Sequence, residues 1–81
     1  MRVAVVGSCL VDLSVRSAGE LLVDTSNPAE IVWGAGGAGR NVAEDLARLG
    51  AEVTMVTDLG GDLPARWLRE GLEALGVTVR V

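Results

Sequence analysis

The sequence contains no lysine, histidine, phenylalanine or tyrosine, and its only aromatic residues are Trp33 and Trp67. Its seven arginines are scattered along the chain and the formal net charge is −4, so the basic patch of a nucleic-acid-binding protein is missing. We therefore expect no nucleic-acid partner. Valine, leucine and alanine must build the core, and such a composition favours layered α/β packing.

Cysteine and long hydrophobic runs are also scarce. Cys9 is the only cysteine, which excludes an internal disulfide and is typical of a reducing compartment. We expect it to be a small buried hydrophobic residue. The apolar run before Gly7 is too short for a signal peptide, and no later run approaches the length of a membrane span. The sequence thus predicts a cytoplasmic protein that has no membrane partner.

The hydrophobic pattern predicts alternating strands and helices in one small α/β domain. Valine-rich segments 2–6, 52–57 and 77–81 are predicted strands of a parallel sheet, and the first is expected to be central and covered on both faces. Amphipathic spacing predicts a helix over residues 40–49, with Val42, Leu46 and Leu49 on its apolar face and Ala43 and Ala47 beside them. A second helix is predicted to begin at the N-cap Asp62 and to end before Gly76.

Residues 13–33 have a different pattern. Short apolar groups alternate there with turn residues, which predicts hairpin-like strands of a small peripheral sheet. Such strands form either an ordinary β-meander or a flap over a ligand. The pattern alone leaves both interpretations open.

A glycine-rich run, residues 34–39, directly precedes the first predicted helix. Glycines allow the backbone to approach a ligand closely. The polar groups that remain nearby are Asp12, expected just past the first strand, and Asn41, expected in the first helical turn. A carboxylate accepts hydrogen bonds from hydroxyls and an amide both donates and accepts, so together they suit a polyol or phosphate clasp. The alternatives are a loop-capping role for Asp12 and a surface position for Asn41.

The same run also satisfies another pattern. Gly34, Gly36 and Gly39 fit G-x-G-x-x-G, and Asp58 ends the next predicted strand, as in a dinucleotide-binding Rossmann fold. Against this alternative, the apolar group before Gly34 is short and follows a turn. Asn41 would have no role in such a site.

Two segments, GGAGRNVA at 36–43 and LARLGA at 46–51, resemble the first signature of the ribokinase-like (PfkB-type) carbohydrate and nucleoside kinases. Gly7 and Ser8 followed by Asp12 are similar to the first strand of that family and its substrate-holding aspartate. Residues 59–62 resemble the glycine-aspartate turn after its next strand. The resemblance covers nearly the whole chain, and the wording of residues 39–46 is nearest to the pseudouridine-kinase branch.

The resemblance implies that Asp12, the backbone of Gly36 and Gly37, and the side chain of Asn41 hold the hydroxyls of a sugar or nucleoside. Residues 1–81 would be the N-terminal, substrate-binding part of a ribokinase-like domain, with lid strands within about residues 13–33 that also form a homodimer. The C-terminal part would bind ATP and Mg²⁺ and supply the catalytic base. We therefore expect no catalytic residue and no turnover in this chain alone.

A further alternative comes from another class of protein. The chain would be a non-catalytic binding or dimerisation module that associates through the lid strands and an exposed sheet edge. Such a module would form stable oligomers and would have no affinity for sugars.

Overall fold

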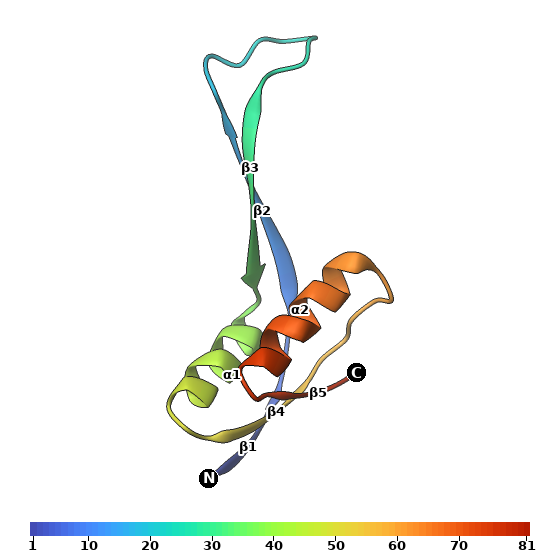
Figure 1. Ribbon diagram of the computed structural model, residues 1–81. Coiled ribbons are helices and arrows are strands. Elements are labelled where there is room, and N and C mark those ends of the chain that lie inside the picture. Colours follow the sequence, from blue (N-terminus) through green and yellow to red (C-terminus); the bar gives the residue numbers. More distant parts are fainter.

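Three valine-rich strands form a parallel sheet in this computed structural model, which describes residues 1–81; the sheet and two helices make up the body of the molecule (Figure 1). The strands β1 (Arg2–Val6), β4 (Glu52–Val56) and β5 (Thr78–Arg80) lie in the order β1-β4-β5. Their register aligns Val5 with Met55 and Met55 with Val79. These side chains therefore share one face of the sheet.

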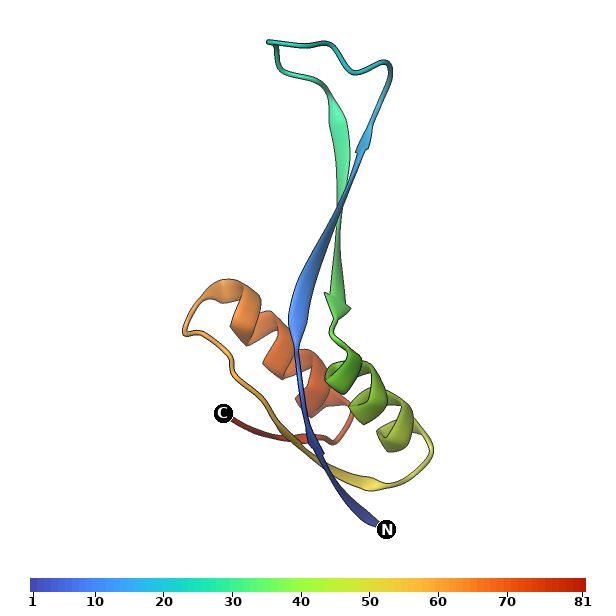
Figure 2. The ribbon, with the colours of Figure 1, turned by 180° about the vertical axis from the view of Figure 1, so that it is seen from behind.

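Both helices cover that same face (Figures 1 and 2). Ala43 of α1 (Ala38–Arg48) and Leu68 and Leu72 of α2 (Leu63–Ala74) form the buried core with the strands. Neither helix is long and apolar enough to cross a membrane. The predicted α/β class and parallel sheet are confirmed.

The sequence pattern predicts a central first strand covered on both faces, but within residues 1–81 neither holds. Among these residues β1 is an edge strand, and Val6 on its outer face is 79% exposed. The two crossovers advance in the same direction across the sheet, and a right-handed connection then places both helices on one side. No other element of residues 1–81 covers the opposite face.

The helix ends lie where the capping residues predicted them, whereas the apolar face of α1 differs in part from its prediction. The Asp62 carboxylate accepts a hydrogen bond from Ala65 N at 3.0 Å, and Gly76 ends α2 with a φ of 85°. Of the apolar face predicted for α1, Ala43, Leu46 and Ala47 contact the core, whereas Val42 and the C-cap residue Leu49 are 48% and 83% exposed.

A long antiparallel hairpin projects from the body and gives the chain extents of 53 × 26 × 18 Å (Figure 1). It consists of β2 (Leu10–Ser17) and β3 (Ala29–Gly36). The strands thus begin closer to the body than the predicted range 13–33, and residues 21–23 lie in the connecting loop. Asp12, expected in a loop, is inside β2 opposite Gly34.

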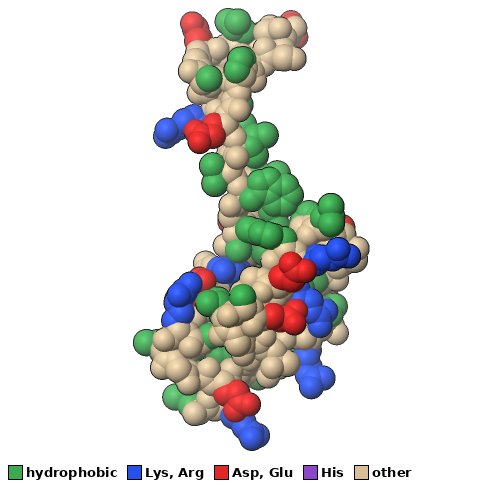
Figure 3. Space-filling model, in the orientation of Figure 1, with side chains coloured by type: hydrophobic (Ala, Val, Ile, Leu, Met, Phe, Trp, Pro, Cys, Tyr) green, Lys and Arg blue, Asp and Glu red, His purple; other side chains and the backbone are tan.

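The register divides the hairpin into two faces. The apolar face carries two cross-strand pairs, Leu13 with Trp33 and Val15 with Ile31, and every one of these side chains is at least half exposed. Hydrophobic side chains are visible along the projecting hairpin in Figure 3. The opposite face, which we call the polar face, carries Asp12, Ser14, Val32, Arg16 and Glu30.

This topology excludes the Rossmann alternative. In a dinucleotide-binding fold, the first glycine directly follows a strand of the parallel sheet. Here Gly34 and Gly36 lie within β3 of the antiparallel hairpin, and the parallel strand β1 ends at Gly7. The match to G-x-G-x-x-G is therefore a chance match in sequence that has no corresponding structure.

Candidate functional site

The glycine-rich run crosses the loop that follows β1, and the two backbones touch. Arg40 N donates a hydrogen bond to Ser8 O at 3.0 Å. A Cβ atom on Gly39 would lie 2.8 Å from Gly7 Cα, well inside van der Waals contact. Gly37 has a φ of 98°, and a Cβ there would lie 2.8 Å from the Ser8 carbonyl carbon. These two glycines therefore leave room for a neighbouring segment of the chain. The sequence analysis had explained the glycines by the close approach of a ligand instead.

Asp12 and Gly36, two of the predicted site residues, are in direct contact. A methyl group on Gly36 would collide with Asp12 Oδ2 and would lie 2.9 Å from Asp12 Cγ. Gly36 is buried, so the carboxylate occupies the space that a side chain would fill. No hydrogen bond or ion pair within the chain uses the Asp12 carboxylate, which is exposed on the polar face of the hairpin. Its oxygens are free to accept hydrogen bonds from a ligand.

Asn41 occupies the first turn of α1, as predicted. Its backbone N donates to Gly37 O at 3.0 Å, which ties it to the glycine run. Its side chain is exposed, and Oδ1 accepts a hydrogen bond from Arg40 Nη1 at 3.2 Å. No hydrogen bond joins Asn41 to Asp12.

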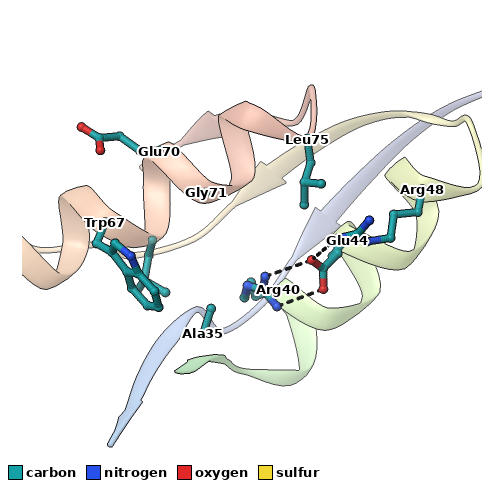
Figure 4. A pocket seen from close by; sticks show the side chains of 9 residues that line it. Ala35, Arg40, Glu44, Arg48, Trp67, Glu70, Gly71 and Leu75 are labelled. Atoms are coloured by element: carbon teal, nitrogen blue, oxygen red, sulfur yellow. Dashed lines mark hydrogen bonds and ion pairs between the residues drawn. The ribbon is translucent and has the colours of Figure 1, made fainter. Parts of the chain in front are cut away.

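Arg40 is part of an ion-pair ladder along α1 (Figure 4). Its two terminal nitrogens each contact a different oxygen of Glu44, both at 3.3 Å. Arg48 reaches the same carboxylate at 3.2 Å. The hydrogen bond from Arg48, reinforced by Arg40, lowers the pKa of Glu44 although partial burial opposes it. The i, i+4 spacing of these three residues was visible in the sequence, but it gave no sign of the contact with Asn41.

A cavity of 470 Å³ lies between the two helices. The ladder lines one side, and Trp67 and Leu75 of α2 line the other (Figure 4). Trp67 also packs edge to face against Trp33 of the hairpin, with ring centroids 6.1 Å apart. Neither Asp12 nor Asn41 lines this cavity, so it is separate from the predicted site.

A second hollow, of 280 Å³, lies where β1 and β4 end. It is lined by the loop Gly7–Leu10 together with Thr57 and Asp58. The carboxyl ends of parallel strands are the usual place for ligands in α/β sheets. Thr57 and Asp58 are therefore candidate site residues that the sequence placed only at a strand end. No three His, Cys, Asp or Glu side chains gather anywhere in the chain as a metal site.

Cys9 is part of this loop. It is 6% exposed, and burial raises the pKa of its thiol against the opposing effect of the Arg40 charge. The prediction of a buried hydrophobic cysteine is confirmed.

Curated relatives of this chain include nucleoside kinases and a ribokinase. It is 35% identical over 78 residues to the guanosine-inosine kinase of Exiguobacterium acetylicum, covering 96% of this chain and 26% of that protein. It is 34% identical over 77 residues to the pseudouridine kinase of Escherichia coli, covering 95% and 25%. The chain thus spans about a quarter of the length of these relatives.

Solved structures agree with this kinship. A carbohydrate kinase from Agrobacterium tumefaciens matches with a TM-score of 0.89 and 32% identity, over 98% of this chain and 26% of that one. A fructokinase from Xylella fastidiosa, solved with bound ATP, matches with a TM-score of 0.78 and 32% identity, over 96% and 24%. A family model described as "pfkB family carbohydrate kinase" matches residues 1–81. The chain belongs to the PfkB family of carbohydrate kinases.

Proposed function

We propose that this chain is the acceptor-binding part of an ATP-dependent kinase that phosphorylates a hydroxyl group of a sugar or nucleoside. The observation that carries the proposal is the Asp12 carboxylate, which lies on Gly36 at the base of the hairpin and has no partner within the chain. The relatives named for guanosine, inosine and pseudouridine support a ribose-bearing acceptor.

The chemistry of the proposed residues suits hydroxyl groups. An ionised carboxylate at Asp12 accepts hydrogen bonds from two hydroxyls, and such charge-assisted bonds are stronger than neutral ones. The backbone of Gly36 and Gly37 and the amide of Asn41 complete the proposed set. A ligand that lacks one of the hydroxyls leaves a polar group without a partner, which costs about 1–3 kcal/mol.

The remaining parts of the reaction are proposed to lie in the rest of the kinase. The catalytic base, ATP and Mg²⁺ are assigned to a part of the protein beyond these residues, so this chain alone should bind an acceptor without turnover. ATP and Mg²⁺ would supply the phosphoryl group and neutralise its charge. A cytoplasmic location is the corresponding expectation for the whole protein.

The hairpin has two proposed roles that use its two faces. Its polar face, which carries Asp12, would cover the acceptor as a lid and exclude water. Its apolar face, with Leu13, Val15, Ile31 and Trp33 each at least 50% exposed, would pair with a second copy in a homodimer.

Titration calorimetry tests the acceptor site. Guanosine, pseudouridine, ribose and NAD are titrated into the wild-type chain, the Asp12→Ala variant and the control Asp45→Asn, which alters an exposed carboxylate of α1. We expect a hydroxylated ligand to bind the wild type and the control, and at least tenfold weaker binding to Asp12→Ala, since about 1.4 kcal/mol is lost per tenfold change.

Three outcomes would contradict the proposal. Binding that is indifferent to Asp12, or no binding of any sugar or nucleoside, removes the acceptor site. Stable oligomers that bind none of these ligands would instead favour the non-catalytic dimerisation module.

A further inference from the structure

The contact between Arg40 and Asn41 is not explained by the fold, because neither side chain belongs to the hydrophobic core. We infer that Arg40 is a positioning residue whose guanidinium fixes the side-chain amide of Asn41, so that Asn41 meets the acceptor with its NH₂ group. The inference rests on the proposed function for the identity of the ligand. The ordering of the amide itself rests on the geometry alone.

The chemistry of arginine sets the orientation of the amide. A guanidinium has donors and no acceptor, so the group of Asn41 that faces Arg40 Nη1 at 3.2 Å must be the oxygen Oδ1. Without such a partner, the terminal torsion of an exposed asparagine is broad and roughly twofold. With it, the two N–H donors of Nδ2 are on the side away from Arg40.

Arg40 is itself held firmly enough to do this. Its side chain is only 12% exposed, and Glu44 binds both terminal nitrogens, whereas the Arg48 side chain is 63% exposed. The planar fork of arginine loses less conformational freedom per hydrogen bond than a flexible ammonium group. Glu44 therefore clamps the guanidinium, and the guanidinium in turn holds the amide.

The ordered amide complements Asp12. The Asp12 carboxylate can only accept hydrogen bonds, while a fixed Asn41 presents mainly donors. A hydroxyl group can donate to the first and its oxygen can accept from the second, so the two residues together match the donor and acceptor of hydroxyl groups. We expect a hydroxylated acceptor to be favoured over the corresponding deoxy compound.

Nuclear magnetic resonance tests the ordering without any ligand. Asn27 and Asn41 are the only asparagines and the chain has no glutamine, so only two side-chain carboxamide NH₂ groups appear in a ¹⁵N spectrum. Asn27 is an internal reference, because its Nδ2 donates to Leu22 O and Thr25 O at 3.0 and 3.1 Å. The variants are Arg40→Met, which keeps the apolar stem, and the matched control Arg48→Met, which removes the other arginine bound to Glu44.

We expect the order parameter of the Asn41 NH₂ group to fall below about 0.6 in Arg40→Met and to keep its wild-type value in Arg48→Met. The Asn27 signal should not change in either variant. Glu44→Gln, which loosens the guanidinium without removing it, is a second variant and should move the Asn41 signal in the same direction. Equal mobility of Asn41 in the wild type and in Arg40→Met, or an equal effect of Arg48→Met, overturns the inference.

A double-mutant cycle tests the consequence for binding. With guanosine as the probe, Arg40→Met should weaken affinity about five- to tenfold and should have no further effect in an Asn41→Ala background. An equal loss in both backgrounds would show that Arg40 acts independently of Asn41 and would overturn the positioning role. If the wild type binds no sugar or nucleoside, the proposed function fails, and the resonance measurement still decides whether Arg40 orders the amide.

Discussion

Alanine at Gly39 should destabilise the free protein, although Gly39 lies in a helix where alanine is normally preferred. Its Cβ atom would lie 2.8 Å from Gly7 Cα and 2.9 Å from Ser8 N, both backbone atoms. Carbon atoms pack at about 3.5–4.0 Å, so the two segments would have to separate by nearly 1 Å. Such overpacking costs about 1–3 kcal/mol, of which the better helix propensity of alanine returns at most about 1 kcal/mol.

Gly71→Ala is the matched control, because Gly71 lies in α2 and nothing surrounds the position of its Cβ within 4 Å. Alanine there should stabilise the protein by about 1 kcal/mol. Urea unfolding of the 81-residue chain, followed by circular dichroism at 222 nm, measures both variants. We expect the free energy of unfolding to fall by about 1–2 kcal/mol for Gly39→Ala, with the opposite sign for Gly71→Ala.

The result that would refute this reasoning is a Gly39→Ala variant as stable as the wild type. It would mean that the two loops separate without cost. The glycine would then be required for a ligand, as its place in a glycine-rich run suggests. A loss of ligand affinity without a loss of stability would support that reading.

Four further predictions concern single side chains. Gly36→Ala meets only the flexible end of Asp12, so calorimetric acceptor affinity should fall while the urea midpoint changes little; a large stability loss contradicts this. The pKa of Glu44 is lowered from its ordinary value of 4.5, so the stability it adds is present above that pH and lost as the pH falls through the lowered pKa; the difference in unfolding free energy between wild type and Glu44→Gln should shrink in acid. Cys9, buried with a raised pKa, should react with a thiol reagent only at the rate of opening, and fast labelling of the folded chain would argue against its burial. Trp67→Phe should weaken the contact with Trp33 and alter the near-ultraviolet dichroism, at a cost of about 0.5–1.5 kcal/mol; an unchanged spectrum would show that the rings do not interact.

Local signals in the sequence were sufficient for most of the elements. The cap at Asp62, the stop at Gly76 and the valine-rich strands predicted the body because each depends on near neighbours along the chain. The place of β1 at the sheet edge depends on how crossovers are arranged in space, which no local pattern encodes. The exposure of Val42 and Leu49 likewise depends on which side of α1 meets the sheet.

The binding roles of Asp12, Gly36, Gly37 and Asn41 stay predictions, and the sequence indicated their geometry only in part. The structure brings Asp12 and Gly36 together and places Asn41 one turn into α1. The reason for the glycines at 37 and 39 was missed. A close contact between two backbone segments requires glycine just as a ligand site does, so the sequence pattern is the same in both cases. The bond from Arg40 to Asn41 was missed as well, since neighbours along a helix do not normally face each other.

In the lid role proposed for the hairpin, Asp12 would move least, because it lies near the base of the hairpin. Its eight-residue strand β2 is about 27 Å long at a rise of about 3.4 Å per residue, and Asp12 is the third residue from the body. A swing of about 10° at the base would carry the far end through about 5 Å and Asp12 through about 1 Å. The lid role proposed above would therefore move the far end over a bound molecule while Asp12 stays against Gly36.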